Sequence, residues 1–135
     1  MAKWFHADVL DKGLQEIRDK ELAGVVEMHL LDAAPAIPPV YATVIADSLN
    51  DPGVNLENAD SPIAASGQDR QLQIIAKVGV ATRTFAASAG DLHVGILDIT
   101  NSLVLAVTQE TSEQAITNTN NINFPAFNLT MKQPV

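Results

Sequence analysis

The feature that most constrains the fold is a pair of apolar runs in the second half of the chain, at residues 93–99 and 103–108. Only Thr100, Asn101 and Ser102 separate the two runs, and residues of this kind favour tight turns. Two apolar runs joined by so short a polar link predict a β-hairpin. This hairpin is the clearest structural element that the sequence predicts.

Further short strands are predicted on both sides of the hairpin. The runs at 25–31, 72–80 and 122–131 are rich in apolar residues and are bounded by turn formers. Residues 82–86 extend the second run, and Pro125 indicates a bulge or a sheet edge near the beginning of the last. Several short strands joined by turns predict a mainly β fold, an antiparallel sandwich or barrel.

The segment between the first two runs is less regular. Residues 34–39 hold three prolines, which make a stiff, extended connection that cannot donate hydrogen bonds to the interior of a sheet. Residues 41–45 fit either a short strand or a helical turn, and the pattern does not decide between them. Residues 47–62 are rich in Asp, Asn, Pro and Gly and are predicted to form a loop.

One amphipathic helix is predicted near the N-terminus, at residues 8–23. Asp8 suits the N-cap position, and Gly24 suits the end of the helix. Gly13 within this stretch costs about 1 kcal/mol relative to alanine, so the helix needs a packing partner. The apolar residues at helical spacing are Val9, Leu10, Leu14, Ile17 and Leu22.

The length of 135 residues gives room for a single domain. We divide residues 1–135 into an N-terminal arm and helix (1–23) and a β-body (24–135) with the proline-rich connection at 34–39. The chain is 47% hydrophobic, but 19 alanines and six aromatic residues mean that small and β-branched side chains build the core.

The charge balance excludes one class of partner. Sixteen Asp and Glu residues against eight Lys and Arg give a formal net charge of −8. Nucleic-acid binding depends on cationic side chains that release counterions from phosphates, so we expect no nucleic-acid partner. No apolar run approaches about 20 residues, so we expect no membrane span. The N-terminus lacks the layout of a signal peptide, and we expect the chain to be made in a cytoplasm.

The sequence contains no motif that indicates a metal site. Cysteine is absent, and the histidines lie far apart, so we expect neither a thiolate site nor a bound metal. The histidines are His6, His29 and His93. We expect the second and third to lie on strands and to satisfy hydrogen bonds there. Four carboxylates fall within 14 residues, but their spacing fails the EF-hand pattern and fits solvated loop acids. They are Asp47, Asp51, Glu57 and Asp60.

No arrangement of residues indicates catalysis. Asp91 and Asp98 lie next to predicted turns, where acidic residues are common, and no serine occupies a G-x-S-x-G setting. No glycine-rich segment fits a phosphate-binding or dinucleotide-binding loop. We therefore expect no catalytic residue and no cofactor.

Two segments at the ends of the chain carry a recognisable sequence pattern. The first is the opening Met-Ala-Lys-Trp-Phe-His-Ala-Asp-Val-Leu-Asp-Lys-Gly-Leu. The second is a strand ending in Leu-Val-Leu-Ala-Val-Thr, followed by Gln-Glu-Thr-Ser-Glu-Gln-Ala-Ile-Thr and then Asn-Ile-Asn-Phe-Pro-Ala-Phe. Together they resemble a group of small virion proteins of tailed bacteriophages. The resemblance covers residues 1–20 and 93–134, whereas the proline-rich segment and the acidic loop after it depart from the pattern.

The resemblance implies a structural protein of the phage head, most similar to a capsid decoration (cement) protein with a jelly-roll-like β-sandwich body. It implies the major capsid protein as partner, a homo-dimer or homo-trimer, and a place on the outer surface of the virion. The negative charge agrees with an outer location, because phage DNA is polyanionic. A head–tail connector, neck or tail-completion protein is the alternative, and a carbohydrate-binding β-sandwich module is a more distant one. The family pattern contains no catalytic motif, so no enzymatic activity is implied.

The N-terminal arm supplies the candidate partner-binding residues. Trp4 and Phe5 are two of the six aromatic residues and precede the predicted helix. We hypothesise that they anchor against the β-body or a neighbouring subunit, with Leu10, Leu14 and Ile17 continuing the contact. The alternative is that they only cover the core of their own chain.

Overall fold

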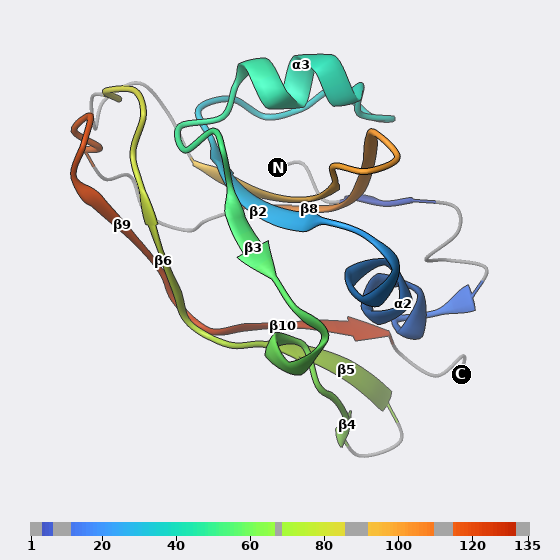
Figure 1. Ribbon diagram of the computed structural model, residues 1–135. Helices are drawn as coiled ribbons and strands as arrows, with labels where there is room; N and C mark the ends of the chain where they lie inside the picture. Colours follow the sequence, from blue (N-terminus) through green and yellow to red (C-terminus); the bar gives the residue numbers. More distant parts are fainter. Residues whose placement is uncertain (1–3, 7–11, 67–68, 86–91, 110–114, 132–135) are drawn as a thin grey trace.

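The computed structural model describes residues 4–6, 12–66, 69–85, 92–109 and 115–131, and it is mainly β with antiparallel pairing (Figure 1). The described strands are β1 (Trp4–Phe5), β2 (Val26–Leu31), β3 (Val54–Leu56), β4 (Ile63–Ser66), β5 (Asp69–Ile74), β6 (Lys77–Val80), β7 (His93–Asp98), β8 (Leu103–Gln109), β9 (Asn121–Phe124) and β10 (Phe127–Met131). The described helices are α2 (Gln15–Ala23), α3 (Tyr41–Ala46) and the 3-10 turn η1 (Asn58–Asp60).

The predicted hairpin forms the centre of the largest sheet. Strands β7 and β8 pair antiparallel, and the turn between them places Ser102 at φ 55°. The sheet has the order β1-β8-β7-β2-β3. The N-terminal arm adds β1 at one edge, where Trp4 lies opposite Val107. The prediction of a hairpin at residues 93–108 is confirmed.

Two smaller sheets have the orders β10-β5-β4 and β6-β9. The sequence predicts single strands at 72–80 and 122–131, but each is split in two, at residues 75–76 and 125–126. Pro125 has no N–H to continue a ladder, which explains the second break. The chain therefore leaves the β10-β5-β4 sheet for the β6-β9 sheet at residues 75–76, and it returns to the first of these sheets at residues 125–126. The predicted extension at 82–86 is wrong, because β6 ends at Val80 and Phe85 forms only an isolated bridge with Ile116.

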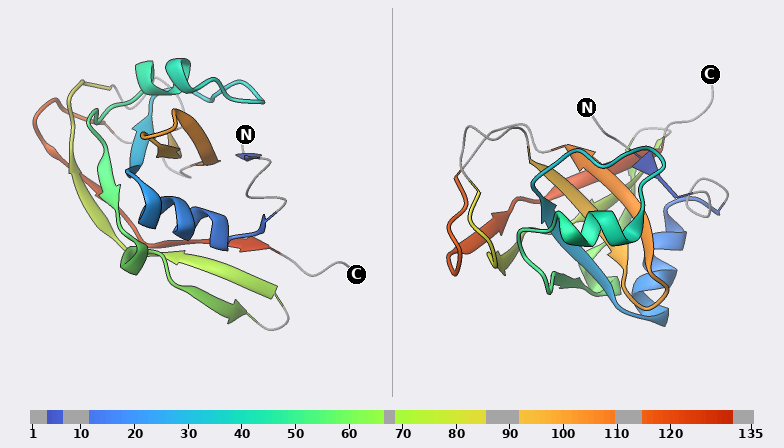
Figure 2. Two further views of the ribbon diagram at one scale, coloured as in Figure 1. Left: turned by 45° about the vertical axis from the view of Figure 1, so that its right-hand side comes forward. Right: turned by 90° about the horizontal axis from the view of Figure 1, so that it is seen from above.

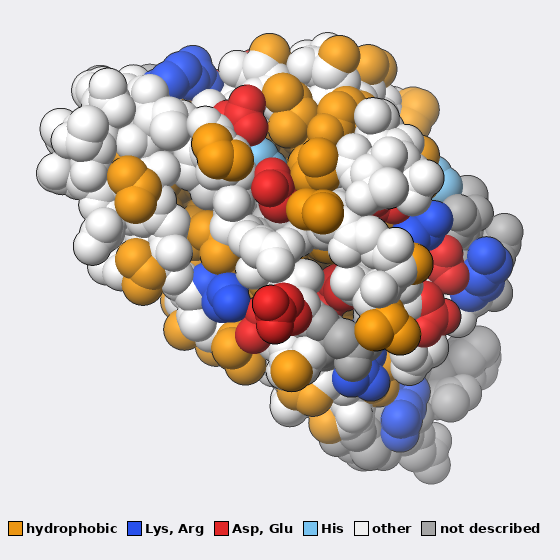
Figure 3. Space-filling model, in the orientation of Figure 1, with side chains coloured by type: hydrophobic (Ala, Val, Ile, Leu, Met, Phe, Trp, Pro, Cys, Tyr) orange, Lys and Arg blue, Asp and Glu red, His pale blue; other side chains and the backbone are white. Residues whose placement is uncertain are grey.

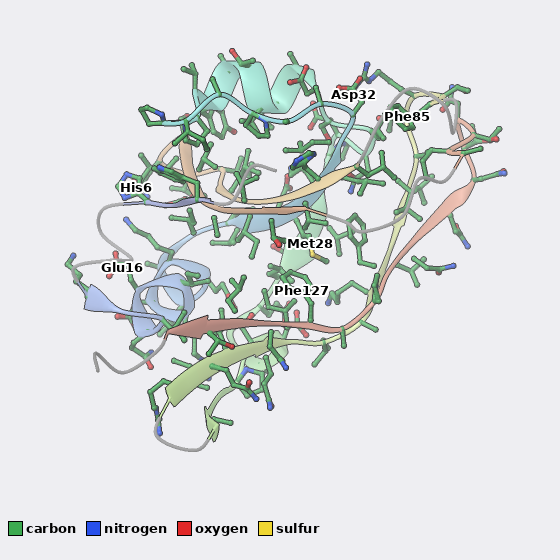
Figure 4. The ribbon with its side chains drawn as sticks, turned by 180° about the vertical axis from the view of Figure 1, so that it is seen from behind. His6, Glu16, Met28, Asp32, Phe85 and Phe127 are labelled. Atoms are coloured by element: carbon green, nitrogen blue, oxygen red, sulfur yellow. The ribbon has the colours of Figure 1, made fainter. Side chains whose placement is uncertain are left out.

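The main core lies between the five-stranded sheet and the two smaller sheets, with α2 packed at one end (Figure 2). Met28 of β2 and Leu72 of β5 are fully buried in it. Figure 4 shows Met28 and Phe127 in the space between the layers, on strands that belong to different sheets. Side chains from strands far apart in the sequence thus meet in one cluster.

Helix α3 covers the opposite face of the five-stranded sheet (Figure 1). Tyr41, Val44 and Ile45 follow helical spacing and pack on this face, where Val44 is buried. The buried residues of this second cluster are Leu31, Val44, Leu97, Val104 and Val107. Because β7 is covered on both faces, all six of its residues are buried, which explains its continuous apolar run.

The predicted N-terminal helix is interrupted at Gly13, and its residues 8–11 lie outside the described ranges. Gly13 takes φ +81°, a left-handed conformation that ends any helical run, and α2 begins only at Gln15. The predicted N-cap, Asp8, lies outside the described residues. Gly24 ends the helix as predicted, and its N–H donates to the Lys20 carbonyl at 3.0 Å.

Residues 41–45, for which the sequence left a strand and a helical turn open, form helix α3, so the N-terminal helix is not the only one. The prediction of a loop over 47–62 is wrong where β3 and η1 lie within it. Strand β3 pairs with β2, its Val54 opposite Met28. Elements of three to six residues depend on tertiary contacts more than on local propensity, so the sequence pattern alone does not show them.

Of the helices in the described ranges, none is long and apolar enough to cross a membrane.

Candidate functional site

The N-terminal arm contacts the body of its own chain. Strand β1 pairs with β8, so the backbones of Trp4 and Phe5 extend the five-stranded sheet. The Trp4 side chain is half-buried against the second hydrophobic cluster, and its ring meets that of His6 edge-on at 5.8 Å. The sheet pairing and the packing of Trp4 anchor the arm to the β-body.

The helical members of the candidate set lie inside the molecule. Leu14 and Ile17 belong to the main core, and Ile17 has no exposed surface. Leu10 lies outside the described residues. The structure thus places Trp4, Leu14 and Ile17 in two different clusters, on opposite faces of the five-stranded sheet. A contact of the arm with a neighbouring subunit stays a prediction.

An uncharged segment, residues 33–46, forms the surface around α3. It contains no Asp, Glu, Lys, Arg or His in a chain of net charge −8. Ile37 is 54% exposed and Val40 is 59% exposed. Figure 3 shows hydrophobic side chains gathered along this side of the molecule. The exposed members of the segment are Ala33, Ala34, Ala36, Ile37, Pro38, Val40, Ala42, Thr43 and Ala46.

Charged residues border this segment at both ends. Arg83 binds Asp32 through Nη2 at 2.8 Å and donates from Nε to the Ser48 carbonyl at 3.0 Å. Asp47 follows α3, and partial desolvation together with the charge of Asp32 raises its pKa. The uncharged segment is therefore an apolar surface with charged residues at one edge, where its two ends meet through the hydrogen bond from the Asp32 N–H to the Asp47 carbonyl.

A second exposed apolar surface lies on the ribbon of β6 and β9. Val78 and Val80 point outward and are 60% and 53% exposed. Their cross-strand neighbours are the exposed Asn123 and Asn121. Each valine thus stands beside a polar side chain, and this surface is more mixed than the uncharged segment.

A buried polar network joins β2 to the segment that follows α3. The Nε2 atom of His29 lies 3.0 Å from Glu27 Oε1, and Nδ1 lies 2.7 Å from Ser48 Oγ. Glu27 Oε1 also accepts from the Gly53 N–H at 3.0 Å. Since the carboxylate accepts from Nε2–H, Nδ1 accepts from the Ser48 hydroxyl, and Ser48 Oγ accepts from the Asn50 N–H at 3.2 Å.

The same residue types form catalytic triads elsewhere, but here they are closed to substrates. His29 has no exposed surface, and Ser48 is 3% exposed. A Cβ atom at Gly53 would overlap the His29 ring, so only glycine allows the chain to cover it so closely. Burial lowers the pKa of His29, against the opposing effect of Glu27, and favours the neutral ring. The network is therefore a structural bridge, and the prediction that His29 satisfies hydrogen bonds on a strand is confirmed.

A buried carboxylate lies where α2 packs against η1. Glu21 is 7% exposed and Ser61 is fully buried. Within the described part of the chain, neither the two carboxylate oxygens nor the Ser61 hydroxyl has a hydrogen-bond partner. Desolvation raises the pKa of Glu21 to about 7. This pair carries no mark in the sequence, because Glu21 lies among the polar residues of an amphipathic helix and nothing in its spacing indicates burial.

The acidic residues that the sequence analysis weighed as a calcium site do not come together. Asp60 accepts a hydrogen bond from the Glu57 N–H at 2.9 Å and pairs with Lys77 at 2.9 Å, and together these contacts outweigh desolvation and lower its pKa. Asp47 lies at the end of α3, beside Arg83. Across the described ranges, no three His, Asp or Glu side chains gather in a group that could hold a metal ion.

Comparison with known proteins returns no match for this chain among protein-family models, curated proteins or solved structures.

Proposed function

We propose that the chain is a capsid decoration protein of a tailed bacteriophage, bound to the outer surface of the head. The observation that carries the proposal is the uncharged segment at 33–46, an exposed apolar surface on a strongly acidic chain. Such a surface suits a protein whose role is to bind other proteins. The body would be a β-sandwich of jelly-roll type, with which the facing antiparallel layers agree.

The position of the virion-like segments adds support. Residues 1–20 and 93–134, which resemble phage virion proteins, lie far apart in the sequence. Their strands β1 and β8 are neighbours in the five-stranded sheet, with Phe5 opposite Ala106. The segment that departs from the resemblance supplies α3, at the outside of that sheet. The two resembling segments thus meet at the β1–β8 edge of this sheet.

The proposed mechanism involves no reaction. A protein that binds across junctions between capsid subunits stabilises the assembled shell by mass action, because it binds the lattice and not free subunits. Capsid sites are related by symmetry, so the decoration protein would act as a homo-dimer or homo-trimer. Burial of the uncharged segment against the major capsid protein would supply the binding free energy.

Copy number in the particle tests the proposal directly. Mass spectrometry of purified virions, before and after mild stripping, should find hundreds of copies that leave with the stripped fraction. Six or twelve copies would instead identify a connector or neck ring, and absence from the particle would reject a virion role. Binding to a glycan array would favour the carbohydrate-binding module.

The two exposed apolar surfaces allow a matched test of the binding face. We expect the double variant Ile37→Asp with Val40→Asp to bind stripped capsids at least about tenfold more weakly, because it places charge within an apolar contact. The control, Val78→Asp with Val80→Asp, changes side chains of equal exposure on the β6–β9 ribbon and should bind like the wild type. Equal loss in both variants would reject the uncharged segment as the capsid-binding face.

Salt gives an independent check on the kind of contact. Apolar contacts persist at high ionic strength, whereas screening weakens exposed charge pairs. We expect the number of bound copies to stay constant or to increase across a salt series, and the melting temperature of the shell to rise on binding. Release at moderate salt, or unchanged shell melting, would contradict the decoration role.

A further inference from the structure

The contact between α2 and the segment after η1 contains a carboxylate in an unusual setting. Glu21 of α2 and Ser61 are both buried, and among the described residues neither side chain makes a hydrogen bond. A buried carboxylate normally accepts several hydrogen bonds, and an ionised one without them is strongly unfavourable. The neutral, protonated acid is the form that such a site tolerates best.

The charges around Glu21 come from α2 itself and from η1. Arg18 lies one turn earlier on α2 and favours the ionised form, whereas Asp60 of η1 disfavours it. Asp60 is held in place by Lys77 of β6 at 2.9 Å and by the Glu57 N–H at 2.9 Å. The nearby Ser61 hydroxyl favours the ionised form, but desolvation is the largest effect and acts in the opposite direction.

We propose that Glu21 and Ser61 form a pH-sensitive contact, which packs α2 against residues 58–61 when Glu21 is protonated and loosens when Glu21 is ionised. The proton is exchanged with solvent at the Glu21 carboxyl group, and no other group changes its covalent state. Ionisation draws water into the contact, because a buried carboxylate needs hydrogen-bond donors and neither Glu21 oxygen has one among the described residues.

Helix α2 and residues 58–61 are each held by other contacts, so the loosening that follows ionisation of Glu21 is local. Leu14, directly before α2, and Ile17 within it hold the beginning of the helix in the main core. At its end, the Val25 N–H donates to Thr100 Oγ1 at 2.9 Å. On the other side, the Ile75 N–H donates to the Asp60 carbonyl at 3.1 Å. Loosening therefore affects the second half of α2 without unfolding the protein, close to neutral pH, where the pKa of about 7 lies.

The test combines a titration with hydrogen exchange on the full chain. The carboxyl carbon of Glu21, followed by carbon-13 NMR, should titrate with a midpoint near pH 7. Protection factors of the α2 amides, corrected for intrinsic exchange, should fall at least about tenfold between pH 6 and pH 8 in the wild type. In Glu21→Gln, which keeps the shape and cannot ionise, the protection should stay constant.

Two further variants complete the test. Asp19→Asn changes an exposed carboxylate on the same helix and should behave like the wild type. Ser61→Ala removes a group that favours the ionised form, so it should move the midpoint to higher pH. A Glu21 midpoint near 4.5, or an equal loss of protection in wild type and Glu21→Gln, would overturn the proposal.

Discussion

Two clusters of polar side chains in the described residues each contain a glutamate and a buried serine, but they differ in their hydrogen bonds. One joins Glu27, His29 and Ser48, and each of these side chains has a hydrogen-bond partner. The other consists of Glu21 and Ser61, whose polar atoms make no hydrogen bonds with the part of the chain that the structure describes. Both hold a carboxylate beside a buried serine, although Glu27 is partly exposed. Composition and burial alone therefore do not show whether a polar cluster stabilises a fold.

The difference lies in what each cluster connects. The first ties β2 to residues 48–53, a segment with little regular structure of its own. Its hydrogen bonds, with those of Asn50, add to the backbone bond from the Leu49 N–H to the Leu30 carbonyl. The second lies between α2 and η1, which other contacts already hold. Removing a hydrogen-bonded group leaves its partners unsatisfied, whereas removing an unsatisfied group relieves a desolvation cost. The two clusters should therefore respond to mutation with opposite signs.

The largest effect is expected at Asn50, which extends the first cluster. Its Oδ1 accepts from the Leu30 N–H at 2.7 Å, and its Nδ2 donates to the Met28 carbonyl at 3.3 Å. Asn50→Ala leaves two buried backbone groups of β2 unpaired and should lower the free energy of unfolding by about 3 kcal/mol in urea denaturation. The control is Asn55→Ala at an exposed position on β3. Equal small effects in both variants would show that the first cluster does not stabilise the fold.

Ser48 gives the next largest effect. Its hydroxyl donates to His29 Nδ1 and accepts from the Asn50 N–H, and it is 3% exposed. Ser48→Ala leaves a buried ring nitrogen and a buried N–H without their partner, so we expect a loss of about 2 kcal/mol. Chemical denaturation at pH 7 measures this loss. A change below about 0.5 kcal/mol would mean that the network tolerates the vacancy, which contradicts the role assigned to it.

The sequence predicts those structural elements that are determined by residues close together in the chain. The hairpin at residues 93–108 is marked by two apolar runs and a polar turn, and the end of α2 is marked by Gly24. No comparable sequence pattern indicates the Glu27–His29–Ser48 cluster or the Glu21–Ser61 pair. His29 and Ser48 lie 19 residues apart, and Asn50 sits among turn formers, where an asparagine is expected for local reasons. Their roles arise only when β2 pairs with its neighbours.

The candidate partner-binding residues also show how far sequence patterns can predict contacts. The apolar spacing of Leu14 and Ile17 correctly indicates a helix face that must be covered. It does not indicate whether the cover is the same chain or another subunit, and here it is the main core of the same chain. The uncharged segment could be recognised from composition. Its exposure could not, because the side of the sheet that α3 covers depends on the whole fold.

Glu21→Gln should change stability in the direction opposite to the first two variants. The folded-state pKa of about 7 exceeds the ordinary value of 4.5, so the folded state holds the proton more tightly. Stability from this group is fully present below pH 4.5 and is lost as the pH rises through 7. At pH 8 we expect Glu21→Gln to be more stable than wild type by about 1–2 kcal/mol. This gain is smaller than the full pKa shift of Glu21 implies, because water that enters the contact on ionisation partly solvates the carboxylate.

Thermal unfolding at pH 4 and pH 8 checks this prediction. At pH 4 the carboxyl group is protonated in both the folded and the unfolded states, so the advantage of Glu21→Gln should disappear. Asp19→Asn, on the exposed side of α2, should show no such difference between the two pH values. A stability gain that is the same at both pH values would mean that the substitution acts through packing and not through ionisation.

The smallest effect is expected at Ser61, and it separates the two clusters most directly. Ser61 is fully buried, as Ser48 nearly is, so the two serine-to-alanine changes remove the same atom from similar burial. No described residue pairs with the Ser61 hydroxyl, so its removal leaves no donor or acceptor newly unsatisfied. We expect Ser61→Ala to change the free energy of unfolding by less than about 0.5 kcal/mol at pH 5.5, where Glu21 is mostly protonated. A loss as large as that of Ser48→Ala would show that the Ser61 hydroxyl has a hydrogen-bond partner in solution, and the two clusters would then be alike.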